Sequence, residues 1–214
     1  MRKGSGKRMG CDITLFCEGY IKEKWINIDR WYRKDDWAEI MVTDAEGFDY
    51  VDLIDGNRDY GLFYLLAGVR GSEAYNSYPP ISPPKGLPEE RDGLLKKEYN
   101  YDNLPDNANF HHASYLTLRE LKESGYGGLM RLKGWVDPDE FEYARSKVQR
   151  GEKHQSHFVD VKEDEYRREG KVYKEWDGYI NLNLTYMIEK MEQLKKERQI
   201  VSDDEVRIVF WFDN

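Results

Sequence analysis

The segment that decides the fold is Met9-Gly10-Cys11-Asp12-Ile13-Thr14-Leu15-Phe16-Cys17-Glu18. It alternates as a β-strand does, because successive side chains of a strand point to opposite faces. One face carries Cys11, Ile13, Leu15 and Cys17. The other face carries Asp12, Thr14, Phe16 and Glu18. Three polar groups therefore share one face at steps of about 7 Å, and we expect functional side chains there.

The chain closes on a second strong β-pattern. Residues 206–214 read Val-Arg-Ile-Val-Phe-Trp-Phe-Asp-Asn, and both faces of this run are mostly apolar. Such a run is typical of a strand in the middle of a sheet. We predict that it pairs with the opening strand, which places Asp213 near the polar side chains at one end of that strand. Residues 25–28 are predicted to be the hairpin partner of the opening strand.

The composition indicates one domain. A chain of 214 residues with 39% hydrophobic residues is long enough to bury one core. Its formal net charge of −8 disfavours duplex nucleic acid as a partner, although a local basic pocket can still hold a small anion. Cys11 and Cys17 lie about 20 Å apart along an extended strand, so no disulfide joins them and we expect free thiols in a reducing cytosol.

No apolar run is long enough to cross a membrane, and the first eight residues lack the apolar core of a secretory signal. We therefore expect a cytoplasmic protein without a membrane partner. Residues 1–8 are predicted to be a flexible extension before a single domain at 9–214. The sequence leaves the formation of homo-oligomers open.

Helices are predicted from apolar spacing and capping residues. In 57–70, apolar side chains recur at helical spacing, Asn57 can cap the start, and Arg70 suits the C-terminal end of the helix dipole. A capping box formed by Thr117 and Glu120 starts a short helix. Two longer helices are predicted at 137–150 and 184–198.

Two long segments are predicted to lack extended regular structure. The stretch 71–115 is rich in proline and tyrosine, so we interpret it as an ordered loop that folds over the domain like a lid. Residues 151–177 are highly charged with few aliphatic residues, and we interpret them as a solvated excursion. The segment 30–37 is predicted to be irregular, and 38–42 to be a strand.

Together these elements predict a single α+β domain. Its sheet is mainly antiparallel and is formed from both chain termini, with helices packed on one face. The 71–115 loop would then cross a polar pocket, in which groups far apart in the chain are gathered.

The four histidines are the main candidates for proton transfer. His154 and His157 fall in the charged stretch and are interpreted as solvated. His111 and His112 stand beside Ser114 at the mouth of a predicted helix, where they bind a phosphate, act in proton transfer, or only cap the helix. Neither pair has a third ligand placed with it, so no metal site is predicted.

Other motifs of common enzymes are absent from the sequence. The acidic residues between 52 and 59 fail the calcium-loop spacing, because Tyr60 and Leu66 stand where glycine and glutamate are required. We interpret these acidic residues as turn and cap residues. No nucleophile elbow, phosphate loop or dinucleotide fingerprint occurs, so no cofactor is predicted.

The polar and cationic side chains point to a small anionic ligand. The guanidinium groups of Arg58 and Arg70 offer bidentate geometry near the ends of the 57–70 helix. Several of the 16 tyrosines lie in the proline-rich loops, where their rings either sandwich a base or pack the loop down. The predicted ligand-binding residues are Thr14, Glu18, Asn57, Arg58, Tyr60, Arg70, Lys85, His112, Ser114, Tyr115 and Asp213. The candidate catalytic residues are His111, His112 and Asp12.

Several motifs together resemble a known family. They are Met-Gly-Cys-Asp-Ile at 9–13, Asp-Tyr-Gly-Leu-Phe at 59–63 with Ala-Gly-Val-Arg at 67–70, Pro-Ile-Ser at 80–82 with Lys-Gly-Leu-Pro at 85–88, His-His-Ala-Ser-Tyr-Leu at 111–116, and Phe-Trp-Phe-Asp-Asn at 210–214. On these motifs the chain resembles a family of bacteriophage and prophage proteins that opens on Met-Gly-Cys-Asp-Ile-His and closes on Phe-Trp-Phe-Asp-Asn. Thr14 stands in place of the family's histidine and Lys85 in place of its arginine. The resemblance implies a phage context, in the host cytoplasm, and leaves the activity open.

Three functions are compatible with these residues. The first is a phage accessory protein that captures a small anionic ligand, such as a nucleotide signal of host antiviral defence; the loss of histidine at Thr14 favours binding over chemistry. The second is a phosphoester hydrolase with His111 or His112 as base, and with Asp12, Glu18 or Asp213 orienting the base or holding a metal. The third is a protein that inhibits a host enzyme through its acidic surface and exposed aromatic residues.

Overall fold

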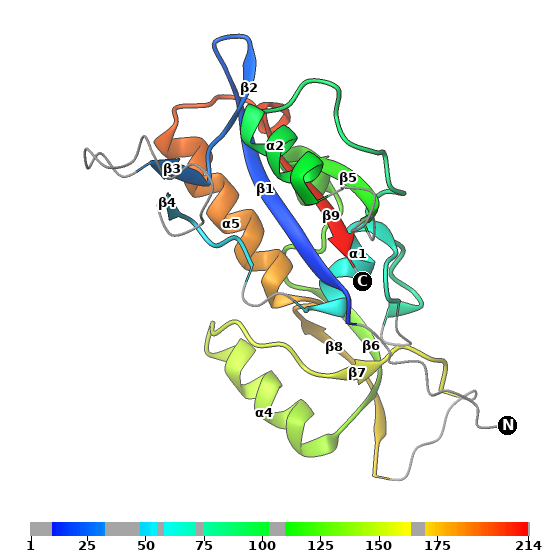
Figure 1. Cartoon of the computed structure of the whole chain (residues 1–214). Coiled ribbons are helices and arrows are strands. Elements are labelled where there is room, and N and C mark those ends of the chain that lie inside the picture. Colours follow the sequence, from blue (N-terminus) through cyan, green and yellow to red (C-terminus); the bar gives the residue numbers. More distant parts are fainter. Residues whose placement is uncertain are drawn as a thin grey trace, which may run out of the picture.

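The computed structural model describes residues 10–32, 48–54, 58–71, 75–102, 110–163 and 170–213. Within these ranges, nine strands form three antiparallel sheets, and five α-helices pack on them (Figure 1). The predicted α+β class with a mainly antiparallel sheet is confirmed. The predicted extension 1–8 and the predicted strand 38–42 lie outside the described residues.

Sheet A joins the two ends of the described chain. β1 (Asp12–Ile21) lies between β2 (Lys24–Asn27) and β9 (Val206–Asp213), and β5 (His111–Thr117) pairs with the other edge of β9. β1 and β9 are antiparallel over eight residue pairs, from Asp12 opposite Asp213 to Gly19 opposite Val206. The predicted pairing of the terminal strands and the predicted hairpin are both confirmed.

Sheet C corrects the prediction of a charged excursion at 151–177. Its central strand is β6 (Met130–Val136), and its outer strands are β7 (Phe158–Val159) and β8 (Val172–Gly178). Phe158 and Trp176 are buried, and their ring centroids are 5.4 Å apart. The prediction was wrong because Trp176 lies between the exposed charged residues Glu175 and Asp177, so the average composition concealed a half-buried sheet.

The remaining strands, β3 (Arg30–Tyr32) and β4 (Phe48–Tyr50), form the two-stranded sheet B. The segment that was predicted to be irregular at 30–37 therefore begins as a short strand. Sheet B lies beside β1, and the chain leaves it through residues 51–54 (Figure 1).

Four helices match predicted ones: α1 (Tyr60–Ala67), α3 (Leu118–Glu123), α4 (Pro138–Gln149) and α5 (Leu182–Glu197). The predicted capping box of α3 is present, with Thr117 and Glu120 bonded reciprocally. The cap of α1 is Asp59, whose carboxylate accepts the Leu62 N–H, whereas the predicted cap Asn57 lies outside the described residues. None of the helices in the described part of the chain has the length and apolarity to span a membrane.

The fifth helix, α2 (Gly93–Asp102), corrects the prediction of a loop over 71–115. The helix lies between Pro88 and Pro105, an interval without proline, and β5 begins near the end of the stretch. Leu95 and Tyr99 are one helical turn apart, and the Tyr99 ring centroid lies 5.2 Å from that of Trp211. The segment does fold over the sheet, but as an amphipathic helix on its front face in Figure 1.

The two faces of sheet A carry separate apolar clusters. The larger core lies on the side of α1 and α5, and the smaller cluster on the side of α2 consists of Phe16, Leu95, Val209 and Trp211. β9 is buried on both faces, as predicted. The face of β1 that was expected to be functional is therefore covered along much of its length, where Phe16 stacks on Trp211 with ring centroids 5.5 Å apart.

A buried ion pair fixes the far end of the β1–β9 ladder. The Arg207 guanidinium lies 2.7 Å from the fully buried Glu18 carboxylate, which also accepts the Asp92 N–H at 2.6 Å. Arg207 also lies 3.7 Å from the centre of the Trp25 ring. Burial raises the pKa of Glu18 and lowers the pKa of Arg207, and both shifts oppose the charged forms. The two side chains stay charged because each is the counter-charge of the other.

The corner between β2 and β3 holds a second buried carboxylate, Asp29. It is 2% exposed and accepts a hydrogen bond of 2.6 Å from the Asn27 amide. Burial raises its pKa to about 6. The folded state therefore holds this proton at a pH at which the unfolded chain has released it.

Replacing Glu18 should be strongly destabilising. Glu18→Gln leaves the Arg207 guanidinium buried without a counter-charge, and we expect the free energy of unfolding to fall by about 3–5 kcal/mol. Urea unfolding measures this difference. The matched control is Glu175→Gln in the exposed pair with Arg131, which should change little. Equal effects of the two variants would contradict the assignment.

Asp29 should make stability depend on pH with a defined sign. Because its pKa is raised in the folded state, its contribution is full below about pH 4 and is lost as the pH rises through about 6. A shift of about 2 units corresponds to about 3 kcal/mol. Asp29→Asn should remove this fall in urea-unfolding free energies measured from pH 4 to 7, whereas Asp177→Asn on the exposed face of sheet C should retain it. A parent curve that is flat over this range would refute the account.

Candidate functional site

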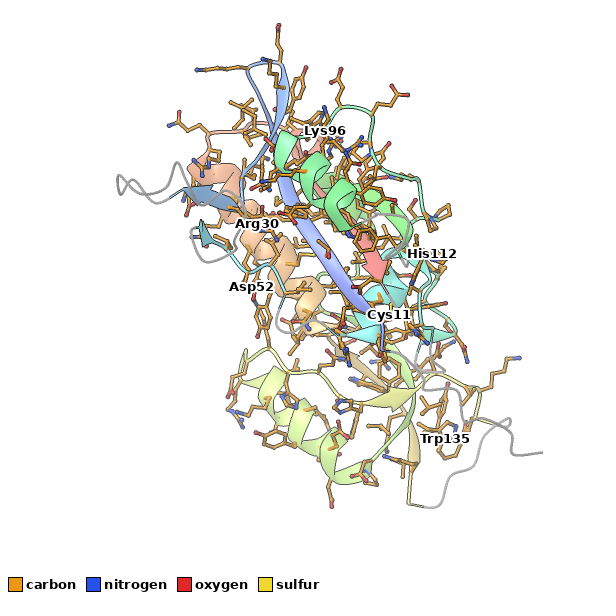
Figure 2. All side chains as sticks on the ribbon, viewed as in Figure 1. Cys11, Arg30, Asp52, Lys96, His112 and Trp135 are labelled. Atoms are coloured by element: carbon orange, nitrogen blue, oxygen red, sulfur yellow. The ribbon has the colours of Figure 1, made fainter. Side chains whose placement is uncertain are left out.

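One end of sheet A gathers polar groups from three strands and from α1. The Sγ atom of the buried Cys11 lies 3.9 Å from His111 Nε2, and the Cys11 N–H donates to the Tyr60 hydroxyl at 3.5 Å. Next to it, the Asp12 N–H donates to the Asp213 carboxylate at 3.2 Å. Figure 2 shows Cys11 and His112 near this same end of the sheet. We call this group of residues the end cluster.

Arg58 enters the end cluster as a partner of Asp12. Its Nε and Nη2 atoms donate to the two carboxylate oxygens at 2.6 and 3.0 Å, which is bidentate geometry. These bonds lower the pKa of Asp12. Gly10 makes room for the guanidinium, because a Cβ at that position would lie 2.6 Å from Arg58 Cζ. The Arg58 side chain is 60% exposed, so it is accessible to a ligand.

The two histidines form a close pair. His111 Nδ1 and His112 Nδ1 are 2.6 Å apart, so one nitrogen must donate and the other accept. The His111 ring lies nearly parallel to Phe212, with centroids 5.9 Å apart and planes at 19°. The pair therefore combines an imidazole held against the core with an exposed one that can exchange its proton with solvent.

His112 owes its position to a β-bulge. The register of β5 against β9 shifts between His111 and Ser114, and His112 has a φ of 51°. A left-handed backbone is unfavourable for a residue with a side chain, by about 1–2 kcal/mol. Bulges turn a side chain to a new direction, and here the bulge brings His112 onto His111.

Arg70 is the second guanidinium of the end cluster. It follows the C-cap of α1, Gly68, and has a φ of 55°. Burial raises the pKa of the Cys11 thiol, and a hydrogen bond with Arg70 opposes that rise. The other described non-glycine residues with positive φ are Lys22, Glu23 and Gln199, which lie in the β1–β2 turn and after α5. Arg70 and His112 thus share both a strained backbone and a location.

The sequence motifs at 59–70, 80–88, 111–116 and 210–214 contact one another around this end of sheet A. The Ile81 N–H donates to the Leu65 carbonyl at 2.8 Å, and the Gly86 N–H donates to the Ala113 carbonyl at 2.9 Å. Phe63 of α1 packs edge-to-face on Phe212 of β9, with ring centroids 5.1 Å apart. Segments distant in the sequence therefore meet in one region through backbone and ring contacts.

The structure brings together seven of the predicted site residues: Asp12, Arg58, Tyr60, Arg70, His111, His112 and Asp213. Cys11 was predicted only as part of the apolar face of β1, but this face ends beside His111 of β5. The alternation placed Cys11 on this face, but the neighbouring strand came only from the structure.

Other predicted residues lie away from the end cluster. Glu18 is fully buried in its ion pair with Arg207. Ser114 is 1% exposed and accepts the Lys85 N–H at 3.1 Å, and the Lys85 ammonium pairs with Glu120. Tyr115 lies under Lys85, with 4.9 Å from Nζ to the ring centre.

Thr14 lines a separate pocket beside β1, and Asn57 lies outside the described residues. His111 and His112 are not at the mouth of a helix, because α3 begins only at Leu118. Among the tyrosines that were predicted to lie in loops, Tyr75 and Tyr78 are buried. Tyr99 lies on α2 and packs on Trp211, so these three rings pack the 71–115 segment onto the rest of the fold.

The described residues contain no group of three or more histidine, cysteine, aspartate or glutamate side chains arranged to hold a metal ion. Comparison with protein-family models, with curated proteins and with solved structures finds no match to this chain. The function must therefore be argued from the geometry of the end cluster.

The strained backbone at His112 gives a stability prediction. Glycine adopts a positive φ without penalty, so His112→Gly should be more stable than His112→Ala by about 1 kcal/mol. Both variants lose the same imidazole, so the difference isolates the backbone term. Urea unfolding of the two variants measures it, and equal stabilities would show that position 112 is not held in the left-handed region.

Proposed function

We propose that the protein binds a small anionic ligand at the end cluster. The observation that carries this proposal is the convergence of two guanidinium groups and two imidazoles on one end of sheet A, although they come from residues 58, 70 and 111–112. Arg58 and His112 are exposed, as is Arg70. A protein with a net charge of −8 needs such a local concentration of cationic groups to attract an anion.

The carboxylates of the end cluster fit this role as orienting groups. Asp12 holds the Arg58 guanidinium in one orientation before a ligand arrives, which reduces the entropy lost on binding.

The exposed ring of Tyr60 in the end cluster favours a nucleotide. Tyr60 is the first residue of α1 and is 40% exposed, and its hydroxyl accepts a hydrogen bond from the Cys11 N–H, just before β1. An exposed ring beside cationic groups is suited to stack a base while the cations hold its phosphate. Together with the resemblance to phage proteins, this supports an accessory protein that sequesters a nucleotide second messenger of host defence.

Calorimetric titration tests the binding of anions. Inorganic phosphate, pyrophosphate and a panel of linear and cyclic nucleotides are titrated into the full chain, and at least one is expected to bind. Arg70→Met should weaken that binding about tenfold or more, because a charge-assisted hydrogen bond contributes about 1.5–3 kcal/mol. The control is Arg150→Met, in an exposed pair with Glu152 on the C-terminal side of α4, which should bind as the parent does.

The same samples separate binding from catalysis. A close imidazole pair is also suited to act as a general base, which would make the protein a phosphoester hydrolase. Chromatography of the ligands after incubation, with and without a divalent metal, should return them unchanged. Product that disappears in His112→Ala would replace the binding proposal by the hydrolase. Absence of binding across the whole panel would refute an anion site and leave inhibition of a host protein to be tested.

A further inference from the structure

A second site lies along the free edge of β1, away from the end cluster. β1 pairs with β2 only from Glu18 onward, so the edge before Glu18 has no neighbouring strand in sheet A. Beside this edge is a cavity of about 220 Å³. It is lined by residues 13–15 of β1, by residues 51–54 that follow β4, and by Asp29 and Arg30. We call this cavity the edge slot.

The peptide groups that face the edge slot can be identified from their neighbours. The Cys17 carbonyl accepts the Ile28 N–H at 2.9 Å, and the Leu15 carbonyl accepts Arg30 Nη2 at 3.3 Å. Both contacts lie on the side of β1 away from β9. Because peptide direction alternates with a period of two, the N–H and C=O of Ile13 and the N–H of Leu15 point to the same side.

These edge groups await a partner. Among the described residues, no hydrogen bond reaches the outward peptide groups of Ile13 or the outward N–H of Leu15. Unpaired edge groups are a template for another strand, and proteins usually cover them. Here 51–54 lies beside the edge but leaves the cavity between, so the edge is flanked without being paired.

Arg30 shows how a donor binds at this edge. Its guanidinium donates a hydrogen bond to the Leu15 carbonyl, as the N–H of an added strand would. The guanidinium carbon also lies 3.7 Å from the centre of the Phe16 ring. Arg30 therefore closes one end of the edge slot. The available groups run from the Leu15 N–H toward Cys11, which is a length suited to a few residues of extended chain.

The size and charge of the edge slot limit the kinds of molecule that can bind in it. A volume of 220 Å³ is that of about seven water molecules and lies below the range of about 300–1,000 Å³ usual for small-molecule pockets. Asp52 is exposed at the slot, and among the described residues no side chain forms an ion pair with its carboxylate. The Lys190 ammonium donates to the main-chain carbonyl of Asp52. The Arg30 guanidinium also lines the slot, where it contacts the Leu15 carbonyl and the Phe16 ring and acts on the Asp29 carboxylate.

We infer that the edge slot binds an extended segment of a partner protein, which pairs as a strand with Ile13 and Leu15 and places a lysine or arginine side chain beside Asp52. Main-chain hydrogen bonds to β1 would supply affinity, and the carboxylate would supply the preference for a basic residue. This inference does not depend on the anion site.

The test uses a displayed library of random peptides about seven residues long, selected on the full chain. An enriched peptide is synthesised in two forms, each N-methylated at alternate residues. Since only one set of alternate N–H groups faces β1, one form should lose binding by about tenfold or more and the other should bind normally. Saturating peptide should also slow hydrogen exchange of the Ile13 and Leu15 amides by about tenfold.

Matched variants locate the bound peptide. Asp52→Lys should weaken an enriched basic peptide about tenfold, whereas Asp177→Lys, at an exposed carboxylate of sheet C, should not. The inference is overturned if no peptide is enriched, if both methylated forms bind alike, or if Asp52→Lys has no effect. It is also overturned if the Ile13 and Leu15 amides become protected in the free protein as its concentration rises, because the occupant would then be a second copy of this chain.

Discussion

The antiparallel ladder between β1 and β9 is the interaction on which the rest of the structure depends. Eight residue pairs join the two ends of the described chain, and β9 carries β5 on its other edge. Because β9 is buried on both faces, it belongs to the large core under α1 and α5 and to the small cluster under α2. The ion pair of Glu18 and Arg207 fixes one end of this ladder. The end cluster forms at the other.

The register of the ladder determines which groups meet at the end cluster. Asp12 lies opposite Asp213, and Phe212 lies between Ile13 on one side and His111 on the other. A slip of one residue would exchange the two faces of β1 and separate Cys11 from His111. The two guanidinium groups come from either side of α1, a helix of eight residues, so a single packed helix positions both. Strand register and helix packing thus assemble the cluster without a dedicated binding motif.

The sequence predicted those features that depend on regular patterns. The two terminal strands were found because the run from Val206 is apolar on both faces, and α3 was found because Thr117 and Glu120 are spaced as a capping box. Elements whose pattern is lost in the average composition of a longer segment were not predicted. In β8, Trp176 is one aromatic ring among charged residues, and α2 hides its apolar side between prolines and polar residues. Glu18 was predicted to contact a ligand because no local pattern indicated its ion-pair partner, Arg207, which lies 189 positions away in the chain.

The sequence predicted which residues belong to the candidate site better than it predicted how these residues are arranged. The residues that cluster were named from their chemistry, but the bulge at His112 and the approach of Arg70 to Cys11 depend on tertiary packing that no local pattern encodes. The most direct test of the central claim, that strand pairing builds one anion site, is an NMR titration of the arginine Nε–H and histidine ring signals with pyrophosphate. The account predicts that the signals of Arg58, Arg70, His111 and His112 shift together with one dissociation constant. Separate dissociation constants, or shifts only at other arginines, would contradict it.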